Sequence, residues 1–230
     1  MVKLWVKTLS TTYNASGAAA AARQGNIVMI VDVIDMSTTA EAAIEAGAIS
    51  VLGASPDHHT VPVSVNPEKI GYYGGKKALK FDTGVIIAAE PRLIDKENDR
   101  LNEIQQVIKG VERAGAMLEE IVPNIGREVV ELTDFKNRVL IIVSPSGGAA
   151  YDAAYNYGAP EVITGTVART NERKGSLTAA SAAQRAVESA LKLKRGITVV
   201  AASSNSMEDV QGAQYICQLI MNNGFLNMDI

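Results

Sequence analysis

The chain is poor in the residues that define several protein classes. It contains one cysteine, Cys217, one tryptophan and three phenylalanines among 230 residues, and aromatic side chains make up 5% of the total. A single cysteine excludes an internal disulfide framework, and the apolar segment QYICQLIM around it favours a small buried hydrophobe over a reactive thiol.

The sequence also lacks an excess of positive charge and any long apolar run. Its 22 lysines and arginines are balanced by 25 acidic residues, which gives a formal net charge of −3 without a basic block. We therefore expect no nucleic-acid partner. No stretch of 18 uninterrupted apolar residues occurs, and the first residues show no signal-peptide pattern, so we expect no membrane partner and a cytoplasmic location.

What the sequence does contain is a regular alternation of apolar strands and alanine-rich helices. With 47% apolar residues, the chain can bury a substantial core. Short β-branched runs predict strands at 3–9, 27–32, 48–54, 84–89, 138–143, 161–165 and 197–202, with helical segments between most of them. This alternation predicts an α/β fold built on a mainly parallel sheet, or sheets, with helices on both faces.

The domain organisation has two alternatives at this point. Residues 1–230 form a single α/β unit, or two intimate lobes at about 1–95 and 138–230. Apolar residues at helical spacing predict a long amphipathic helix at about 98–122, which packs on the sheet or on another subunit. We expect a homo-oligomer. Glycines 74 and 75 predict an interruption in the helix at 67–80, and a strand is expected at 127–132.

Residues 27–48 carry the strongest functional signal. The buried strand ends on Asp32, and the next helix opens with Ser37, Thr38 and Thr39. This turn lies at the carboxyl edge of the sheet, where open α/β folds bind ligands. A carboxylate there can hold a divalent cation, and hydroxyl groups with free N–H groups can hold an oxyanion. The alternative is structural: a capped helix and a stabilised turn.

Two later segments repeat this arrangement of strand, polar turn and helix. The strand at 138–143 runs into Ser146 and Gly147, and the strand at 197–202 is followed by Glu208 and Asp209 at the start of the last helix. Helix capping alone explains the two acids, although both can also serve a site at the same edge. His58 and His59 are adjacent in a proline-rich stretch, which favours solvated loop residues over joint ligands of one metal.

Taken in order, these motifs resemble the 2-phosphosulfolactate phosphatase family, a group of magnesium-dependent phosphatases. Asp32 matches the acid of the family's Asp-Val-Leu-Arg block, and Asp82 with Gly84 matches its Phe-Asp-Leu-Gly segment. The resemblance implies Mg²⁺ as cofactor and a small anionic metabolite as substrate. The site residues that it implies are Asp32, Asp35 and Glu208 for catalysis, Ser37, Thr38, Thr39, Ser146, Gly147 and Thr166 for substrate binding, and Asp32, Asp82 and Asp209 for the metal.

The departures from the family pattern matter as much as the matches. Asp35 stands where the family has an arginine, Ser146 replaces an asparagine before the glycine, and residues 85–87 replace an Asn-Ser-Pro segment. Arginine is the preferred partner of a phosphate, so a carboxylate in its place repels an anion unless a cation lies between them. Asp35 could instead join Asp32 around a magnesium ion.

Three functions therefore compete. The first is a magnesium-dependent phosphatase acting on a small phosphorylated organic acid. The second is a catalytically inactive relative that binds a small metabolite or serves as an oligomeric structural protein. The third is a nucleotide-binding domain, which is the weakest because no G-x-G-x-x-G or G-x-x-x-x-G-K-[ST] motif follows any of the strands.

Overall fold

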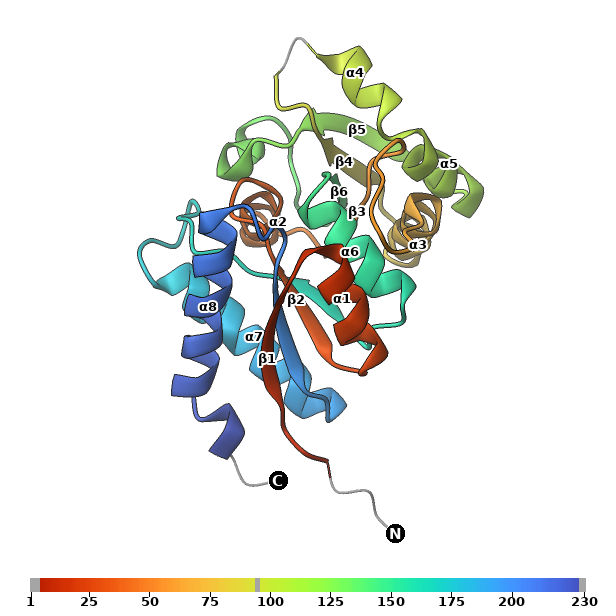
Figure 1. Ribbon diagram of the computed structural model, residues 1–230. Coiled ribbons are helices and arrows are strands. Elements are labelled where there is room, and N and C mark those ends of the chain that lie inside the picture. The colour runs from red at the N-terminus through yellow and green to blue at the C-terminus, as the bar shows by residue number, and fades with distance from the viewer. Residues whose placement is uncertain (1–4, 94–95, 228–230) are drawn as a thin grey trace.

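Two parallel sheets of four strands each form the framework of the computed structural model, which describes residues 5–93 and 96–227 (Figure 1). Sheet A has the strand order β1-β8-β2-β7, with bounds Leu9–Tyr13, Ile197–Ala201, Ile27–Val31 and Val162–Thr164. Sheet B has the order β3-β6-β4-β5, with bounds Ser50–Ala54, Val139–Val143, Val85–Ala89 and Leu118–Pro123. The predicted α/β fold with parallel sheets is confirmed.

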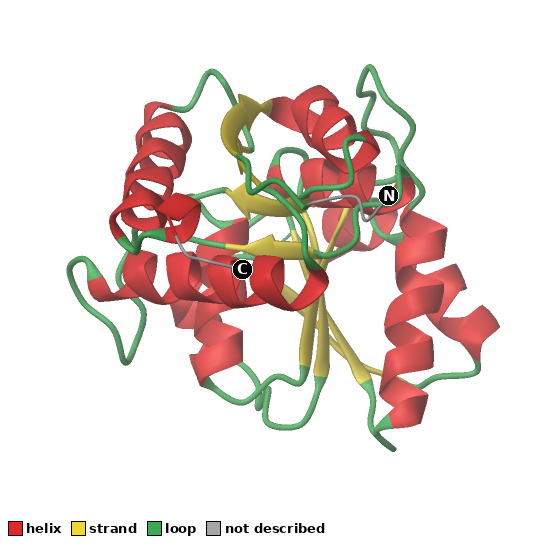
Figure 2. Cartoon of the chain, turned by 90° about the horizontal axis from the view of Figure 1, so that it is seen from below, coloured by secondary structure: helices red, strands yellow, loops and turns green. Residues whose placement is uncertain are grey.

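Helices cover both faces of the sheets, as the view from below shows (Figure 2). The helices are α1 (Asn14–Arg23), α2 (Met36–Glu45), α3 (Pro67–Lys80), α4 (Glu97–Asn102), α5 (Gln105–Ala114), α6 (Gly147–Asn156), α7 (Leu177–Leu193) and α8 (Met207–Asn222), with short 3-10 helices η1 (Gly126–Glu131) and η2 (Phe225–Asn227). No helix within these described ranges has both the length and the apolar character needed to cross a membrane.

The strands are buried on both faces because helices cover each side. Every residue of β2, β4, β6 and β8 is buried. In β2, Val28 and Ile30 face a core shared with sheet B, whereas Ile27, Met29 and Val31 face the core under α7 and α8. This alternation explains why the strands appear as continuous apolar runs rather than as alternating patterns.

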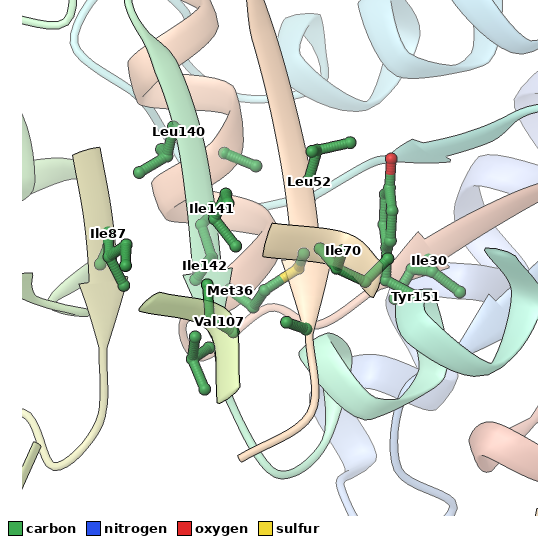
Figure 3. Close-up of a cluster of buried hydrophobic side chains, with 14 of the residues drawn as sticks. Ile30, Met36, Leu52, Ile70, Ile87, Val107, Leu140, Ile141, Ile142 and Tyr151 are labelled. Atoms are coloured by element: carbon green, nitrogen blue, oxygen red, sulfur yellow. The ribbon is translucent and has the colours of Figure 1, made fainter. Parts of the chain in front are cut away.

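Helices α2 and α6 lie between the two sheets and contact strands of both. Figure 3 shows Met36 of α2 and Tyr151 of α6 among the buried side chains around Leu52 of β3 and Ile142 of β6. The Tyr151 hydroxyl lies 3.4 Å from the carbonyl oxygen of Val51 and 3.3 Å from that of Val162, so it joins the facing edges of the two sheets.

The sheets do not follow the lobe boundaries considered from the sequence. Sheet A takes two strands from each end of the chain, β1 and β2 from the first part and β7 and β8 from the last. Sheet B pairs β3 and β4 of the first part with β5 and with β6, which begins at Val139. The chain thus leaves sheet A after β2, builds sheet B, and returns.

The predicted long helix at 98–122 is wrong. The segment forms two short helices, α4 and α5, and then the edge strand β5. Gly115 adopts a left-handed conformation with φ 78° and ends α5, a helix stop that the apolar spacing obscured. In β5 the exposed Glu119 and Glu120 hide the strand pattern, because only one side of this edge strand is paired.

Three smaller predictions also need correction. The first strand is Leu9–Tyr13 rather than 3–9, because pairing with β8 defines the strand. Residues 3 and 4 of the predicted strand lie outside the described residues. Residues 127–132 contain most of η1 instead of a strand, because buried Val129 packs beside α2. Helix α3 continues through Gly74 and Gly75, because these glycines allow close contact with the sheet and with α5.

Candidate active site

The carboxylate of Asp32 joins the carboxyl ends of the two sheets. Asp32 follows β2 and is 2% exposed. Its Oδ2 accepts a hydrogen bond from the Ser146 hydroxyl at 2.6 Å and another from the Gly147 amide at 2.7 Å, both at the end of β6 and the start of α6. The strand end in sheet A and the strand end in sheet B that the sequence singled out therefore meet at one carboxylate.

Glycine at position 147 is required by this close approach. A Cβ added at Gly147 would lie 2.5 Å from Oδ2 of Asp32, closer than any stable contact. Helix α6 thus presents bare backbone to the carboxylate, and its amide N–H groups favour negative charge at this end of the helix. The strand followed by Ser-Gly-Gly is the sequence signature of this contact.

Among the described residues, Asp32 belongs with Glu90, Asp209 and Asp35 to a group of acids at this edge whose carboxyl groups have raised pKa values. Burial raises the pKa of Asp32, although bonds from Ser146, Gly147 and the Met36 amide oppose the shift. Burial and then the Asp32 charge raise the pKa of Glu90, which follows β4, to about 7. Burial is also the main cause that raises the pKa of Asp209 at the start of α8 to about 6.

Asp35 is the fourth of these acids, and it contacts a guanidinium group. Burial raises its pKa most, Arg92 lowers it, and Asp32 and Glu128 raise it further. Nε of Arg92 lies 2.8 Å from the buried Oδ2 of Asp35 but is not aligned for a hydrogen bond. The Arg92 side chain is 53% exposed, so part of the guanidinium faces solvent. An arginine therefore reaches this edge from the loop after β4, although position 35 itself is an acid.

The predicted hydroxyl groups lie at the edge, but their hydrogens are donated within the protein. Ser37 Oγ donates to the Ile30 carbonyl at 3.0 Å and accepts from the Asp32 amide. Thr38 Oγ1 donates to the Val33 carbonyl at 2.7 Å, so the 2.9 Å contact with Thr166 must use the Thr166 hydrogen. In this arrangement these groups support the turns and leave no hydroxyl hydrogen for a ligand.

Of the two predicted acids at the start of α8, only Asp209 is buried. Its carboxylate accepts from the Val33 amide at 2.8 Å and the Ser203 amide at 3.2 Å, which ties the turns after β2 and β8 together. Glu208 is exposed and accepts a hydrogen bond from Ser206. The structure thus places Asp209 beside the turn that carries Asp32.

Asp82, the remaining acid implied by the resemblance, lies elsewhere. It is exposed, has a φ of 52°, and precedes β4, which begins at Val85. The residues that approach Asp32 all follow their strands. Because the strands are parallel, Asp82 lies at the opposite, amino edge of sheet B and is not brought together with Asp32.

Two pockets open beside the acids, each of about 330 Å³. One is lined by Glu90 with His58, and the other by Ser146 with residues 203–205 at the end of β8. His59 and Pro145 line both pockets and lie between them. The volumes of these two hollows fall within the usual range of ligand cavities.

The loop that carries the histidines is fixed at both of its ends by one acid. Asp152, on α6, accepts hydrogen bonds from the Ser55 amide at 3.2 Å and the Asn66 amide at 2.7 Å. Burial raises its pKa to about 6. His58 is exposed and His59 half-buried, so they are loop residues that nevertheless line the pockets.

Sequence reasoning missed Glu90, Arg92 and Asn124. Glu90 and Asn124 each come directly after a strand, β4 and β5, so they satisfy the same rule that identified Asp32. Asn124 is fully buried and contacts both Thr39 and Glu90. Only the hydroxyl-rich turn drew attention to Asp32, whereas Glu90 is followed by proline and has no such neighbours.

The acids are close enough to influence one another but do not form a complete cage for a metal. Within the described residues, no three side chains of Asp, Glu, His or Cys are arranged to hold one ion.

A scan against models of protein families matches none over this chain, and a search of curated proteins also finds no match.

Proposed function

We propose that this protein is a magnesium-dependent hydrolase that removes the phosphoryl group from a small phosphorylated organic acid. The observation that carries the proposal is the gathering of Asp32, Asp35, Glu90 and Asp209 at one edge with raised pKa values. Buried carboxyl groups that repel one another favour a bound cation, and such groups cluster at functional sites. The serial resemblance of the motifs to 2-phosphosulfolactate phosphatases supports the same reaction.

The donor set fits magnesium in a water-rich form. Mg²⁺ is commonly bound through one or two carboxylates and keeps several waters, which substrate phosphate oxygens can replace. Asp32 and Asp35 are the acids that would hold it, with water in the remaining positions. When bound, the ion would offset the charge of these carboxylates and of the phosphoryl oxygens.

The chain itself contributes binding and orientation. Arg92, half-exposed at the edge, is the group suited to hold an anionic oxygen, because a guanidinium pairs well with phosphate or carboxylate. The Ser146 and Gly147 bonds fix the orientation of Asp32. The adjoining pockets would accommodate the organic part of the substrate and exclude some of the surrounding water.

Release of inorganic phosphate from a panel of small phosphorylated acids tests the proposal. The assay is run with Mg²⁺ and with EDTA, on the wild type and on Asp32→Asn and Asp82→Asn. We expect release that needs Mg²⁺, is lost in Asp32→Asn and persists in Asp82→Asn, which changes an acid at the opposite edge. Activity that survives in Asp32→Asn would be contamination and would count against the hydrolase.

A non-catalytic binding protein is the second candidate, and one observation favours it. Asp35 and Arg92 neutralise each other, and the nearby Ser37 and Thr38 hydrogens are already donated to backbone carbonyls. If no substrate of the panel is cleaved, calorimetry with the same phosphorylated acids separates a binding protein, which would release heat on binding, from one that only assembles.

A further inference from the structure

A hydrogen-bonded chain runs from the backbone through two side chains to Glu90. The Gly126 amide donates to Thr39 Oγ1 at 3.0 Å, and Thr39 Oγ1 donates to Asn124 Oδ1 at 2.7 Å. Nδ2 of Asn124 then donates to Glu90 Oε1 at 3.3 Å. Thr39 and Asn124 are both completely buried.

The order of donors in this chain follows from the shorter of two contacts. Because Thr39 receives the Gly126 N–H, its single hydrogen has two possible acceptors, Asn124 Oδ1 at 2.7 Å and the Gly126 carbonyl at 3.2 Å, and the shorter contact favours Asn124. The amide nitrogen therefore faces Glu90 and can only donate. Oε1 of Glu90 is consequently an acceptor, and the proton of the acid form belongs on Oε2.

Glu90 is the member of the acidic group that also lines a pocket. That pocket, of about 330 Å³, is bounded by Pro56, His58, His59, Pro91, Glu103 and Pro145 as well. Across the edge, Asp32 and Asp35 disfavour a negative charge on Glu90, and Arg92 favours one. A carboxyl group oriented by a buried amide and open to a ligand-sized space is suited to proton transfer.

We propose that Glu90 donates the proton to the leaving oxygen during hydrolysis, and that Asn124 and Thr39 position it. This inference rests on the proposed hydrolase function. The bond between phosphorus and the ester oxygen breaks, and that oxygen takes the proton from Oε2 of Glu90 to leave as an alcohol. Water forms the new bond to phosphorus, and one of its protons restores the acid form of Glu90. The products are the alcohol and inorganic phosphate.

The acidity of Glu90 agrees with this role. Burial, the larger cause, and then the Asp32 charge raise its pKa to about 7. A cation held by Asp32 would offset the second cause, whereas burial still favours the protonated acid. A general acid is most effective when its pKa lies near the working pH. The rate should therefore fall as the pH rises above this pKa, when Glu90 loses its proton.

Two substrates with different leaving groups test the proposal. An alkyl phosphate needs protonation of its leaving oxygen, whereas p-nitrophenyl phosphate releases a stable phenolate without it. We expect Glu90→Gln to lower kcat/KM for the alkyl phosphate by about 10²–10⁴-fold, the usual contribution of a general acid. The rate with p-nitrophenyl phosphate should change little, and the fall of the alkyl-phosphate rate above neutral pH should disappear.

Three further variants separate catalysis from a structural effect. Glu103→Gln removes an acid from the same pocket outside the hydrogen-bonded chain, and it should change both substrates by the same factor. Glu90→Asp retains an acid and should keep part of the substrate preference. Asn124→Ala should shift the pH at which the alkyl-phosphate rate falls, because it removes the donor to Oε1. Circular dichroism verifies that each variant is folded.

The outcomes are distinct. An equal loss for both substrates in folded Glu90→Gln, or an unchanged alkyl-phosphate rate, overturns the role of Glu90 while leaving the hydrolase intact. If Glu90→Gln does not fold, the same ratio measured in Glu90→Asp decides. If the wild type cleaves neither substrate nor any member of the phosphorylated-acid panel, the hydrolase proposal fails and the proton-donor role fails with it.

Discussion

The two ends of helix α2 treat acidic side chains in opposite ways. Near its start, Asp32 and Asp35 lie in a group of acids. Among the described residues, the ion pair that this group makes joins Asp35 to Arg92. In its second half, Glu41 accepts from Arg185 at 2.5 Å and from Thr164 at 3.1 Å. Glu45 likewise accepts from Arg173 at 2.7 Å and from Thr170 at 2.6 Å.

This difference separates acids that are paired with arginines from acids that lie mainly beside other acids. Burial raises the pKa of Glu41, and its arginine partners oppose this rise. The same arginines tie α2 to α7 and to the segment after β7. At the other end of the helix the acids raise one another's pKa, and the pockets lie beside them. Uncompensated charge near open space is the feature that favours binding or catalysis.

The largest expected effect comes from breaking the paired end. Arg185→Met leaves Glu41, which is completely buried, without its cation. Removing one partner of a buried pair destabilises a protein by about 3–5 kcal/mol, so we expect a loss of this size in urea unfolding. Adding Glu41→Gln to this variant should recover part of the stability. A loss below about 1 kcal/mol, the range of surface pairs, would contradict the contrast.

A smaller effect is expected at the unpaired end from Gly147→Ala. The new methyl group would displace the Asp32 carboxylate, which lies against the glycine. A misplacement of about 1 Å can reduce a rate by roughly 10²-fold, so phosphate release should fall by that order. Gly212→Ala, at a helical glycine of α8 where the added Cβ would lie 3.2 Å or more from its neighbours, measures the general effect of adding a methyl group to a helix. Full activity in Gly147→Ala would show that the orientation of Asp32 is unimportant.

Asp152→Asn tests whether the pocket loop depends on a single acid. The two Asp152 oxygens accept from different amides, and an asparagine retains only one acceptor. The unmatched amide should cost about 1–3 kcal/mol, and hydrogen exchange should become faster at the ends of the loop, near Ser55 and Asn66. Unchanged exchange there would mean that the prolines, rather than Asp152, fix the loop.

The smallest effect concerns the pH dependence of stability. The pKa of Glu90 rises from 4.5 in the unfolded chain to about 7, so between these values the folded state binds more protons. Stability should therefore decrease as the pH rises through this window. Glu90→Gln should remove about 1–2 kcal/mol of that decrease, allowing for its partial exposure. Thermal unfolding at pH 5 and pH 8 measures the change, and equal slopes for both proteins would contradict it.

The α/β fold was largely predictable because most of its strands are continuous apolar runs that are easy to recognise in the sequence. Runs such as IVMIV and VLIIV are β-branched and apolar on both faces, which is typical of a parallel sheet covered by helices. The division into two sheets was not predictable, because it depends on which strands pair across long distances in sequence. The edge strands β1 and β5 were missed or misplaced for a related reason: their polar residues give no buried pattern, and pairing alone defines them.

The candidate site was predictable only in part. A polar turn after a buried strand identified Asp32, Ser146 and Gly147, and the structure joins them by hydrogen bonds. Asp82 lies in a short motif that resembles the family pattern, but it precedes its strand. The motif therefore did not predict at which edge of the sheet Asp82 lies. Glu90 directly follows strand β4, as Asp32 follows β2. It lacks the neighbouring hydroxyl groups that drew attention to the turn after Asp32.

Magnesium-dependent phosphate release, compared between the wild type and Asp32→Asn on the best substrate of the panel, tests the central claim most directly. We expect the folded variant to lose at least about 10²-fold in kcat/KM, because the acid at the junction of the two sheets is gone. A folded Asp32→Asn protein that releases phosphate at the wild-type rate after rigorous purification would contradict it.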